Sequence, residues 1–159
     1  MPKEHIGSRP ALNIDDNAIV QEANDAVAHL VAELQTGWEQ HDAEITDGHL
    51  AADVAWGNPF GAIVNGYDRL HGIHVKLKEQ SKGGSASRFE VERVLVSAPG
   101  VTVAHVKRVA LKANGQPVEP SSDTSNAFSE MALYVLVRRD GAWWVAAGQN
   151  TPVRPGGAV

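Results

Sequence analysis

The hydrophobic residues near the start of the chain recur at the spacing of an α-helix with one buried face. The positions that share this face are Ala23, Val27, Leu30, Val31, Leu34 and Trp38. Residues three and four apart lie on the same side of a helix, so the pattern predicts one long amphipathic helix. Asp15 or Asp16 is suited to cap its first turn. This helix must bury its apolar face against another part of the fold.

Two shorter helices are expected after it. Asp42 is a good N-cap and predicts a helix that runs to about residue 50. A third helix is predicted over residues 68–80, and a glycine-rich stretch over 82–85 ends it. The residues on its predicted inner face are Leu70, Ile73, His74 and Leu77. A histidine therefore lies among the apolar residues of this helix.

The rest of the chain has the alternation and the turn residues that are typical of β-strands. Strands are predicted over residues 54–58, 62–65, 88–97, 101–112, 128–139 and 142–149. The last two are joined by Asp140-Gly141, a two-residue hairpin turn. Residues 112–127 form a long polar loop, which we expect to be mobile because little apolar burial offsets the entropy of ordering it.

This order of helices and strands predicts a single α+β domain. An antiparallel meander beside one long helix has to curve around that helix. We therefore expect a cone-shaped, mixed or antiparallel sheet wrapped around the N-terminal helix, with a cavity between them. The domain is expected over residues 15–151, with a flexible arm over 1–14 and a flexible tail over 152–159.

Composition narrows the functions that this domain can have. A chain of 159 residues is long enough for one core and one internal pocket, but not for a separate cofactor domain. The net charge is −5 and Lys and Arg are not clustered, which argues against nucleic acid as a partner. No apolar run reaches the ~18 residues that cross a membrane. With no cysteine, disulfides, thiolate catalysis and Cys-ligated metals are excluded.

The N-terminal residues bear on where the protein acts. Residues 1–13 include Lys3, Glu4, His5 and Arg9 but lack the apolar core of a secretion signal. We therefore expect a cytoplasmic protein.

The last hairpin has a pairing that follows from its turn. With residues 140–141 as the loop, Tyr134 faces Ala147 and Ala132 faces Gln149. The face with Tyr134 and Gln149 is expected to line the cavity, because a binding site needs some polar groups. The opposite, apolar face is expected to meet a second copy of the chain and form a homodimer. A β-bulge would exchange the two faces.

Several stretches together match one known group of proteins. They are Trp38 followed by Asp42, the strand-turn-strand of residues 53–66, His74, and above all residues 135–151. Over about residues 22–151 the chain resembles the SgcJ/EcaC-type proteins of the nuclear-transport-factor-2-like (SnoaL-like) superfamily. The resemblance implies a cystatin-like, cone-shaped α+β barrel that is usually a homodimer. It also implies a protein that occurs together with antibiotic-biosynthesis proteins, including those that make enediyne polyketides.

The wider superfamily leaves the activity open. It includes polyketide cyclases, ketosteroid isomerases, epoxide hydrolases and non-catalytic binding modules, so the fold alone does not give the function. Isomerase-like members carry a carboxylate just before the proline of the first strand-turn, where this chain has Asn58. The paired acidic and Arg residues of the epoxide hydrolases are not recognisable either.

His74 and Asn58 are the residues that we single out for catalysis. An imidazole titrates near neutral pH, so His74 could act as general acid or base; otherwise it is a hydrogen-bonded core residue. Asn58 could hydrogen-bond a ligand carbonyl, or it could simply start the turn at Pro59.

The residues expected to bind a ligand are mostly aromatic, because aromatic rings stack on flat conjugated molecules. They are Trp38, Trp56, Phe60, Phe89, His105, Tyr134 and Gln149. Each aromatic residue could equally be part of the core. His105 points either into the cavity or to the sheet surface.

No metal or organic cofactor is expected. His71 and His74 could both contact a metal, but a third ligand at a suitable spacing is missing. We expect a protein that acts on a hydrophobic polyene or polyketide, and a cofactor-independent cyclase or isomerase with His74 as acid–base group is one form of it. The alternative is a non-catalytic module that holds the same ligand. An exposed, hydrogen-bonded His74 would favour catalysis, and a dry aromatic pocket would favour storage.

Overall fold

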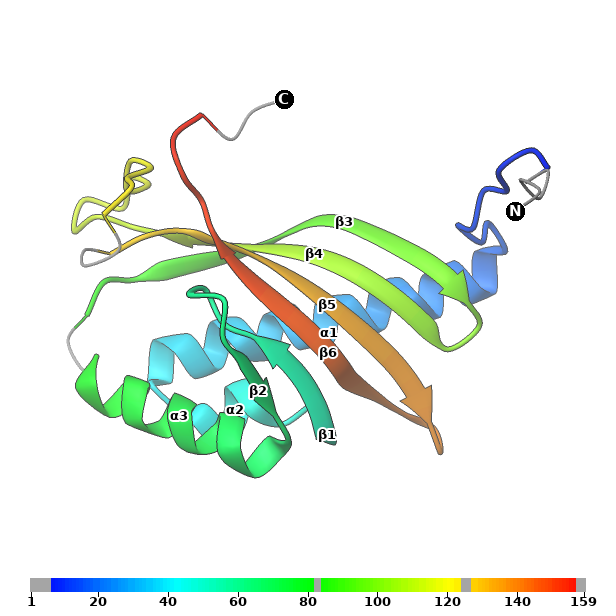
Figure 1. Cartoon of the computed structure of the whole chain (residues 1–159), viewed down its shortest axis with the longest axis horizontal. Coiled ribbons are helices and arrows are strands. Elements are labelled where there is room, and N and C mark those ends of the chain that lie inside the picture. The colour runs from blue at the N-terminus through cyan, green and yellow to red at the C-terminus, as the bar shows by residue number, and fades with distance from the viewer. Residues whose placement is uncertain (1–6, 82–83, 124–126, 157–159) are drawn as a thin grey trace, which may run out of the picture.

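The long helix α1 (Asn17–Gln40) crosses one face of a curved six-stranded sheet (Figure 1). The computed structural model describes residues 7–81, 84–123 and 127–156. Asp16 caps α1 by accepting a hydrogen bond of 3.1 Å from the backbone N–H of Ile19. The predicted long helix and its buried face are confirmed, since Ala23, Val27, Leu30, Leu34 and Gly37 are buried.

The two short helices lie side by side at one end of the molecule (Figure 1). Helix α2 (Ala43–Asp47) starts at the predicted cap, Asp42, but is shorter than expected because the chain enters a strand at Leu50. Helix α3 (Tyr67–Gln80) follows the second strand.

The inner face of α3 differs from the prediction. Leu70 is buried, but Ile73 and Leu77 are exposed to solvent. His71 and His74 turn toward α2 instead, because they hydrogen-bond to a buried carboxylate there. Polar pairing with Asp47, together with burial of Leu70, therefore orients this helix.

The strands form one mixed sheet in the order β2-β1-β6-β5-β4-β3. Their bounds are β1 (Leu50–Gly57), β2 (Ile63–Asn65), β3 (Ser87–Ala98), β4 (Val101–Ala110), β5 (Glu130–Arg139) and β6 (Ala142–Pro152). β1 pairs with β6 in parallel, and every other neighbouring pair is antiparallel. The predicted α+β class with a curved, mixed sheet is confirmed.

A β-bulge changes the predicted pairing of the last hairpin. Leu136 pairs with Val145, but Val135 pairs with Ala147, so β6 has one extra residue at position 146. Tyr134 consequently faces Gly148 and not Ala147 as predicted.

The bulge moves Gln149 to the outer face of the sheet. Trp56 pairs with Gly148, and a Cβ at Gly148 would lie 2.2 Å from the indole of Trp56. A glycine is therefore required where the inward-facing indole crosses β6. Gln149 follows on the opposite face, beside Gly57 and Leu133. Its predicted place in the cavity is wrong.

The space between α1, α3 and the sheet holds one hydrophobic core. Its buried members are Val27, Leu30, Leu34, Leu50, Val54, Trp56, Val64, Leu70, Ala104, Val106, Ala132, Tyr134, Leu136 and Val145. Side chains from α1, from α3 and from five strands thus meet in a single cluster.

The ends of the expected domain are attached to the sheet. The backbone of Ile14 donates to Val96 at 2.8 Å, and Asn13 Oδ1 accepts from Val96 at 3.0 Å, so the end of the expected arm joins β3.

Residues 1–6, 82–83, 124–126 and 157–159 lie outside the described residues, and with them parts of the predicted arm, helix stop, polar loop and tail. The mobility of the loop stays a prediction. None of the described helices has the length and apolarity needed to cross a membrane.

Candidate functional site

A buried carboxylate at the end of α2 holds two imidazoles of α3. Asp47 is only 2% exposed. Its Oδ1 lies 2.7 Å from Nδ1 of His74, and its Oδ2 lies 2.8 Å from Nδ1 of His71. Residues three apart lie on one side of a helix, which lets one carboxylate reach both rings. Because a carboxylate only accepts hydrogen bonds, each Nδ1 carries a proton.

His71 is surrounded by negative charge on both sides. Its Nε2 lies 3.1 Å from Oε1 of Glu44, and the ring of Tyr67 stacks on it with centroids 5.1 Å apart. Burial lowers the pKa of His71, but the hydrogen bond to Asp47 and the charges of Asp47 and Glu44 outweigh it, so the pKa is raised. His71 therefore favours the imidazolium form and balances the charge of Asp47.

His74 keeps one ring nitrogen available. About 26% of its side chain is exposed, and no residue in the described part of the chain pairs with Nε2. With the proton fixed on Nδ1 by Asp47, Nε2 of the neutral ring presents a lone pair. A His ring oriented in this way by a carboxylate can take a proton from a ligand and later return it.

A second cation, Lys78, lies one helical turn beyond His74 on α3. Lys78 Nζ is 5.3 Å from the centre of the Trp38 ring, and Cζ of Arg108 is 4.6 Å from the same ring. Burial lowers the pKa of Lys78, with Arg108 adding to the effect, while Asp47 and Asp42 act against it. Among the described residues the Lys78 ammonium has no carboxylate within ion-pair distance, so it is available to an anionic oxygen.

Arg108 differs from Lys78 because its guanidinium makes three hydrogen bonds and an ion pair with Glu130. Nη2 donates to Glu130 at 2.8 Å and to the carbonyl of Phe128 at 3.0 Å, and Nη1 donates to Ser87 at 3.0 Å. Arg108 therefore links the first residues of β3 and β5. The Trp38 ring that it covers meets Phe89 edge-on, at 6.1 Å between ring centres.

Trp56 and Tyr134 form a second aromatic pair, deeper in the core. Their ring centres are 5.5 Å apart, and both residues are buried. Burial raises the pKa of Tyr134 far above its ordinary value, and the charges of Glu130 and Asp47 add to the rise. The phenol stays protonated at neutral pH, so Tyr134 is a core residue and not a candidate base.

Asn58 stabilises the turn that follows β1, which is one of the two roles predicted for it. Its Oδ1 accepts from the backbone N–H of Phe60 at 3.0 Å and of Ala62 at 2.9 Å. That oxygen is therefore occupied within the turn. Phe60, at the tip of this turn, is 74% exposed and does not line an enclosed cavity.

His105 takes the surface role. It is exposed, and it pairs with Arg93 and Leu133 on the face of the sheet turned away from the core. Gln149 lies on the same outer face and donates to the carbonyl of Asn58 at 3.4 Å. The structure thus brings Trp38 and Phe89 together, with Lys78 of α3 beside Trp38, and His74 lies one turn from Lys78 on the same helix. The other predicted residues lie elsewhere.

The hollow interior expected from the sequence is filled by side chains in the described part of the chain. Surface hollows of about 320 Å³ and about 190 Å³ lie among the described residues. The larger lies between α1 and the β5–β6 hairpin and the smaller beside residues 117–120, and His74 lines neither. A ligand at His74 would therefore bind at a half-exposed surface beside α3.

Asp47, His71 and Lys78 were not predicted as site residues. The spacing of residues 71, 74 and 78 along one helix face was a signal in the sequence. The sequence signal for Asp47 was weaker, because a carboxylate at the end of a short helix is common.

Comparison with known proteins supports the fold. The chain matches neither a protein-family model nor a curated protein sequence. Among solved structures it is similar to a domain of unknown function with a cystatin-like fold from Nostoc punctiforme, at TM-score 0.70 and 14% identity, covering 86% of this chain and 78% of that one. A ketosteroid isomerase-like protein from Erwinia carotovora atroseptica gives TM-score 0.62 and 14% identity over 82% and 96% of the two chains.

A third similar structure is the protein Aln2 from a Streptomyces species. It gives TM-score 0.63 and 12% identity over 87% of this chain and 94% of that one. A further neighbour, from Shewanella oneidensis, is described as NTF-2 like. These likenesses show that the chain has the cystatin-like, nuclear-transport-factor-2-like fold that its sequence suggested.

Proposed function

Starting from this fold and from the imidazole held on its surface, we propose that the protein binds a hydrophobic, carbonyl-bearing small molecule and moves a proton on it without a cofactor. His74 is the acid–base residue. The observation that carries the proposal is the 2.7 Å hydrogen bond between His74 Nδ1 and the buried carboxylate of Asp47. That bond fixes the ring tautomer while 26% of the side chain stays exposed.

The reaction follows from where the groups lie. Nε2 of His74 removes a proton from the carbon next to a ligand carbonyl, and the bonding electrons move onto the carbonyl oxygen. The enolate oxygen is stabilised by the ammonium of Lys78, which lies one turn away on the same helix face. The imidazolium then returns the proton, either to another carbon of a conjugated chain or to the oxygen of a second carbonyl that the enolate carbon has attacked. The first outcome is an isomerisation and the second a cyclisation.

The class of ligand rests on the sequence resemblance and on the aromatic residues. The resemblance to SgcJ/EcaC-type proteins favours a polyene or polyketide intermediate of enediyne or related antibiotic biosynthesis, acted on in the cytoplasm. Trp38 lies beside Lys78 and meets Phe89 edge-on, and aromatic residues next to a cation suit a conjugated, oxygen-bearing chain. One structural neighbour is described as ketosteroid isomerase-like and another comes from a Streptomyces species, which is in keeping with this class.

A non-catalytic binding module is the second candidate function. It is favoured by Asn58, which replaces the carboxylate of isomerase-like members and is engaged in a turn.

The test is to incubate the protein with conjugated polyene ketones and poly-β-ketone intermediates and to follow products by mass spectrometry. In His74→Gln the amide can still hydrogen-bond Asp47 but provides no base, so the rate should fall roughly 10²–10⁴-fold with affinity little changed. His105→Gln is the matched control, because His105 is exposed on the outer face of the sheet. Binding without any product in the wild type would establish the second candidate function, and an unchanged rate in His74→Gln would refute the first.

We also propose a homodimer through the outer face of the sheet. Val103, Val135 and Ala147 are neighbours across β4, β5 and β6 on this face. Trp144 lies on the same face and is exposed. A second copy of the chain would remove this apolar surface from water.

A further inference from the structure

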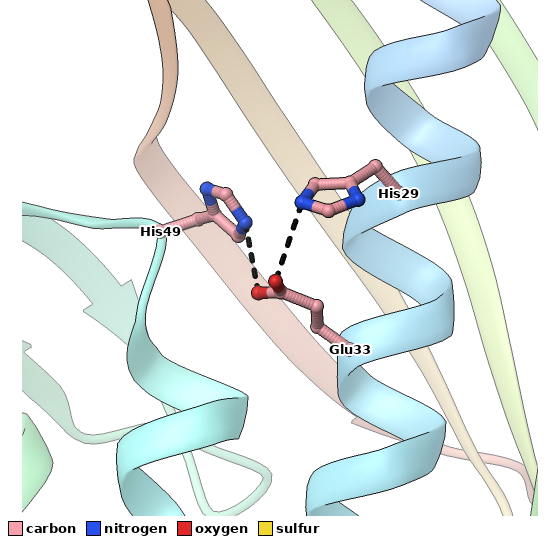
Figure 2. Close-up of side chains that lie close together, drawn as sticks. All are labelled: His29, Glu33 and His49. Atoms are coloured by element: carbon pink, nitrogen blue, oxygen red, sulfur yellow. Dashed lines mark ion pairs between the residues drawn. The ribbon is translucent and has the colours of Figure 1, made fainter.

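A second polar cluster lies on the other side of the turn between α2 and β1. His29 and Glu33 lie one turn apart on α1, and His49 comes from the turn, so that the three side chains converge (Figure 2). Glu33 Oε1 is 3.2 Å from Nε2 of His29, and Oε2 is 2.8 Å from Nε2 of His49. The two imidazole rings lie 5.1 Å apart at an angle of 77°.

We propose that His29, Glu33 and His49 bind a divalent transition-metal ion, with Zn²⁺ as the best match. One ligand atom from each residue lies within 4.8 Å of the other two. Ligands of a tetrahedral zinc ion, with bonds of about 2.0–2.1 Å, are about 3.3 Å apart. Shifts of roughly 1 Å, within the reach of side-chain rotation, therefore bring all three onto one ion.

The donor types select the class of ion. Two imidazole nitrogens and one carboxylate suit Zn²⁺ and its transition-metal neighbours, whereas Mg²⁺ and Ca²⁺ take oxygen ligands. The i and i+4 positions of His29 and Glu33 fix two ligands on one helix face before any metal arrives. His29 is 63% exposed on its side chain, which leaves a path from solvent to the site.

The ion would lie beside an apolar hollow. His29 and His49 line the hollow of about 320 Å³ together with Leu30, Leu136, Trp143 and other residues of α1 and the β5–β6 hairpin. Three protein ligands leave a coordination position open. We expect a water there, or the oxygen of a small molecule whose apolar part occupies the hollow. A metal at this position is independent of the proton transfer at His74.

The experiment is a calorimetric titration of chelator-treated protein with Zn²⁺. The wild type should bind one ion per chain, and its melting temperature should rise at saturation. Glu33→Gln keeps the size and polarity of the side chain but loses the anionic ligand, and His49→Gln loses an imidazole. Each should weaken Zn²⁺ binding by about 100-fold or more. Mutation of residues that only hydrogen-bond a metal's ligands already lowers metal affinity by about 10–100-fold, so loss of a ligand should cost at least as much.

Two variants serve as matched controls. His74→Gln and His105→Gln each remove an imidazole outside the cluster and should bind Zn²⁺ as the wild type does. A wild type without saturable Zn²⁺ binding would overturn the site, as would unchanged affinity in both Glu33→Gln and His49→Gln. Loss of binding in His74→Gln alone would move the metal to Asp47 and contradict the assignment. If His49→Gln does not fold, Glu33→Gln decides, because its side chain lies on the surface of α1.

Discussion

Asp47 gives the two imidazoles that it holds different chemical states. Each ring nitrogen of His71 hydrogen-bonds a carboxylate, and the pKa of His71 is raised. His74 hydrogen-bonds Asp47, and its Nε2 pairs with no residue of the described part of the chain. A buried carboxylate beside a single neutral imidazole would be costly, so the charged His71 also stabilises the anion on which His74 depends.

The raised pKa of His71 predicts how stability changes with pH. A histidine whose pKa in the folded state lies above the ordinary 6.5 contributes stability that is fully present below that value and is lost as the pH rises through the folded-state pKa. The difference in unfolding free energy between wild type and His71→Gln should therefore be largest near about pH 6 and shrink toward about pH 9. Urea unfolding of both proteins across this range measures it. A difference that grows with pH would contradict the assignment of His71 as the charged partner.

At the scale of residues, the sequence could single out His74 as a candidate but could not predict which side chain it contacts. The partner, Asp47, lies 27 residues earlier in the chain, and the contact exists only because α2 and α3 pack together. His29 and Glu33 could be paired from their helical spacing, but His49 joins them only through the turn that starts β1. The sequence therefore predicted no metal site.

At the scale of elements, hydrophobic periodicity predicted the types and approximate bounds of the helices and strands. On α3 it placed Leu70 and His74 on the inner side correctly, but it was wrong for Ile73 and Leu77, which are exposed. Periodicity cannot recognise a face that is held by hydrogen bonds to a buried carboxylate. It also could not predict the bulge in β6, because an alternating pattern does not show where one extra residue enters a strand.

Two glycines test these elements with the same substitution. A Cβ at Gly148 would approach the Trp56 ring to 2.2 Å, so Gly148→Ala should destabilise the protein by about 1–3 kcal/mol through overpacking. A Cβ at Gly72, inside α3, meets nothing within 4 Å, so Gly72→Ala should stabilise it by about 0.5–1 kcal/mol. Chemical denaturation of both variants measures the two effects. A tolerated Gly148→Ala would contradict the packing of β6 on Trp56.

At the scale of the whole molecule, one short turn separates two polar clusters. Asp47 points to α3 and His49 points to α1, with Gly48 between them. The curved sheet meanwhile buries one face against the helices and leaves the other, with its row of Val103, Val135 and Ala147, open. The fold thus carries the proposed acid–base group, the three convergent side chains of the proposed metal site and the face proposed for a second copy of the chain.

The open face predicts the oligomeric state. We expect a dimer by light scattering at micromolar concentration, because pairing the outer faces buries the row of Val103, Val135 and Ala147. Val135→Lys places a charge in the centre of that row and should give a folded monomer. A monomeric wild type would contradict the proposed interface.

The most direct test of the central claim is proton exchange at the ligand itself. The protein is incubated in D₂O with a conjugated polyene ketone that it binds, and deuterium next to the carbonyl is measured by mass spectrometry. If His74 removes and returns that proton, the wild type should introduce deuterium, and His74→Gln should do so roughly 10²–10⁴-fold more slowly while still binding the ketone. Equal deuterium incorporation by the wild type and a folded His74→Gln would contradict the account.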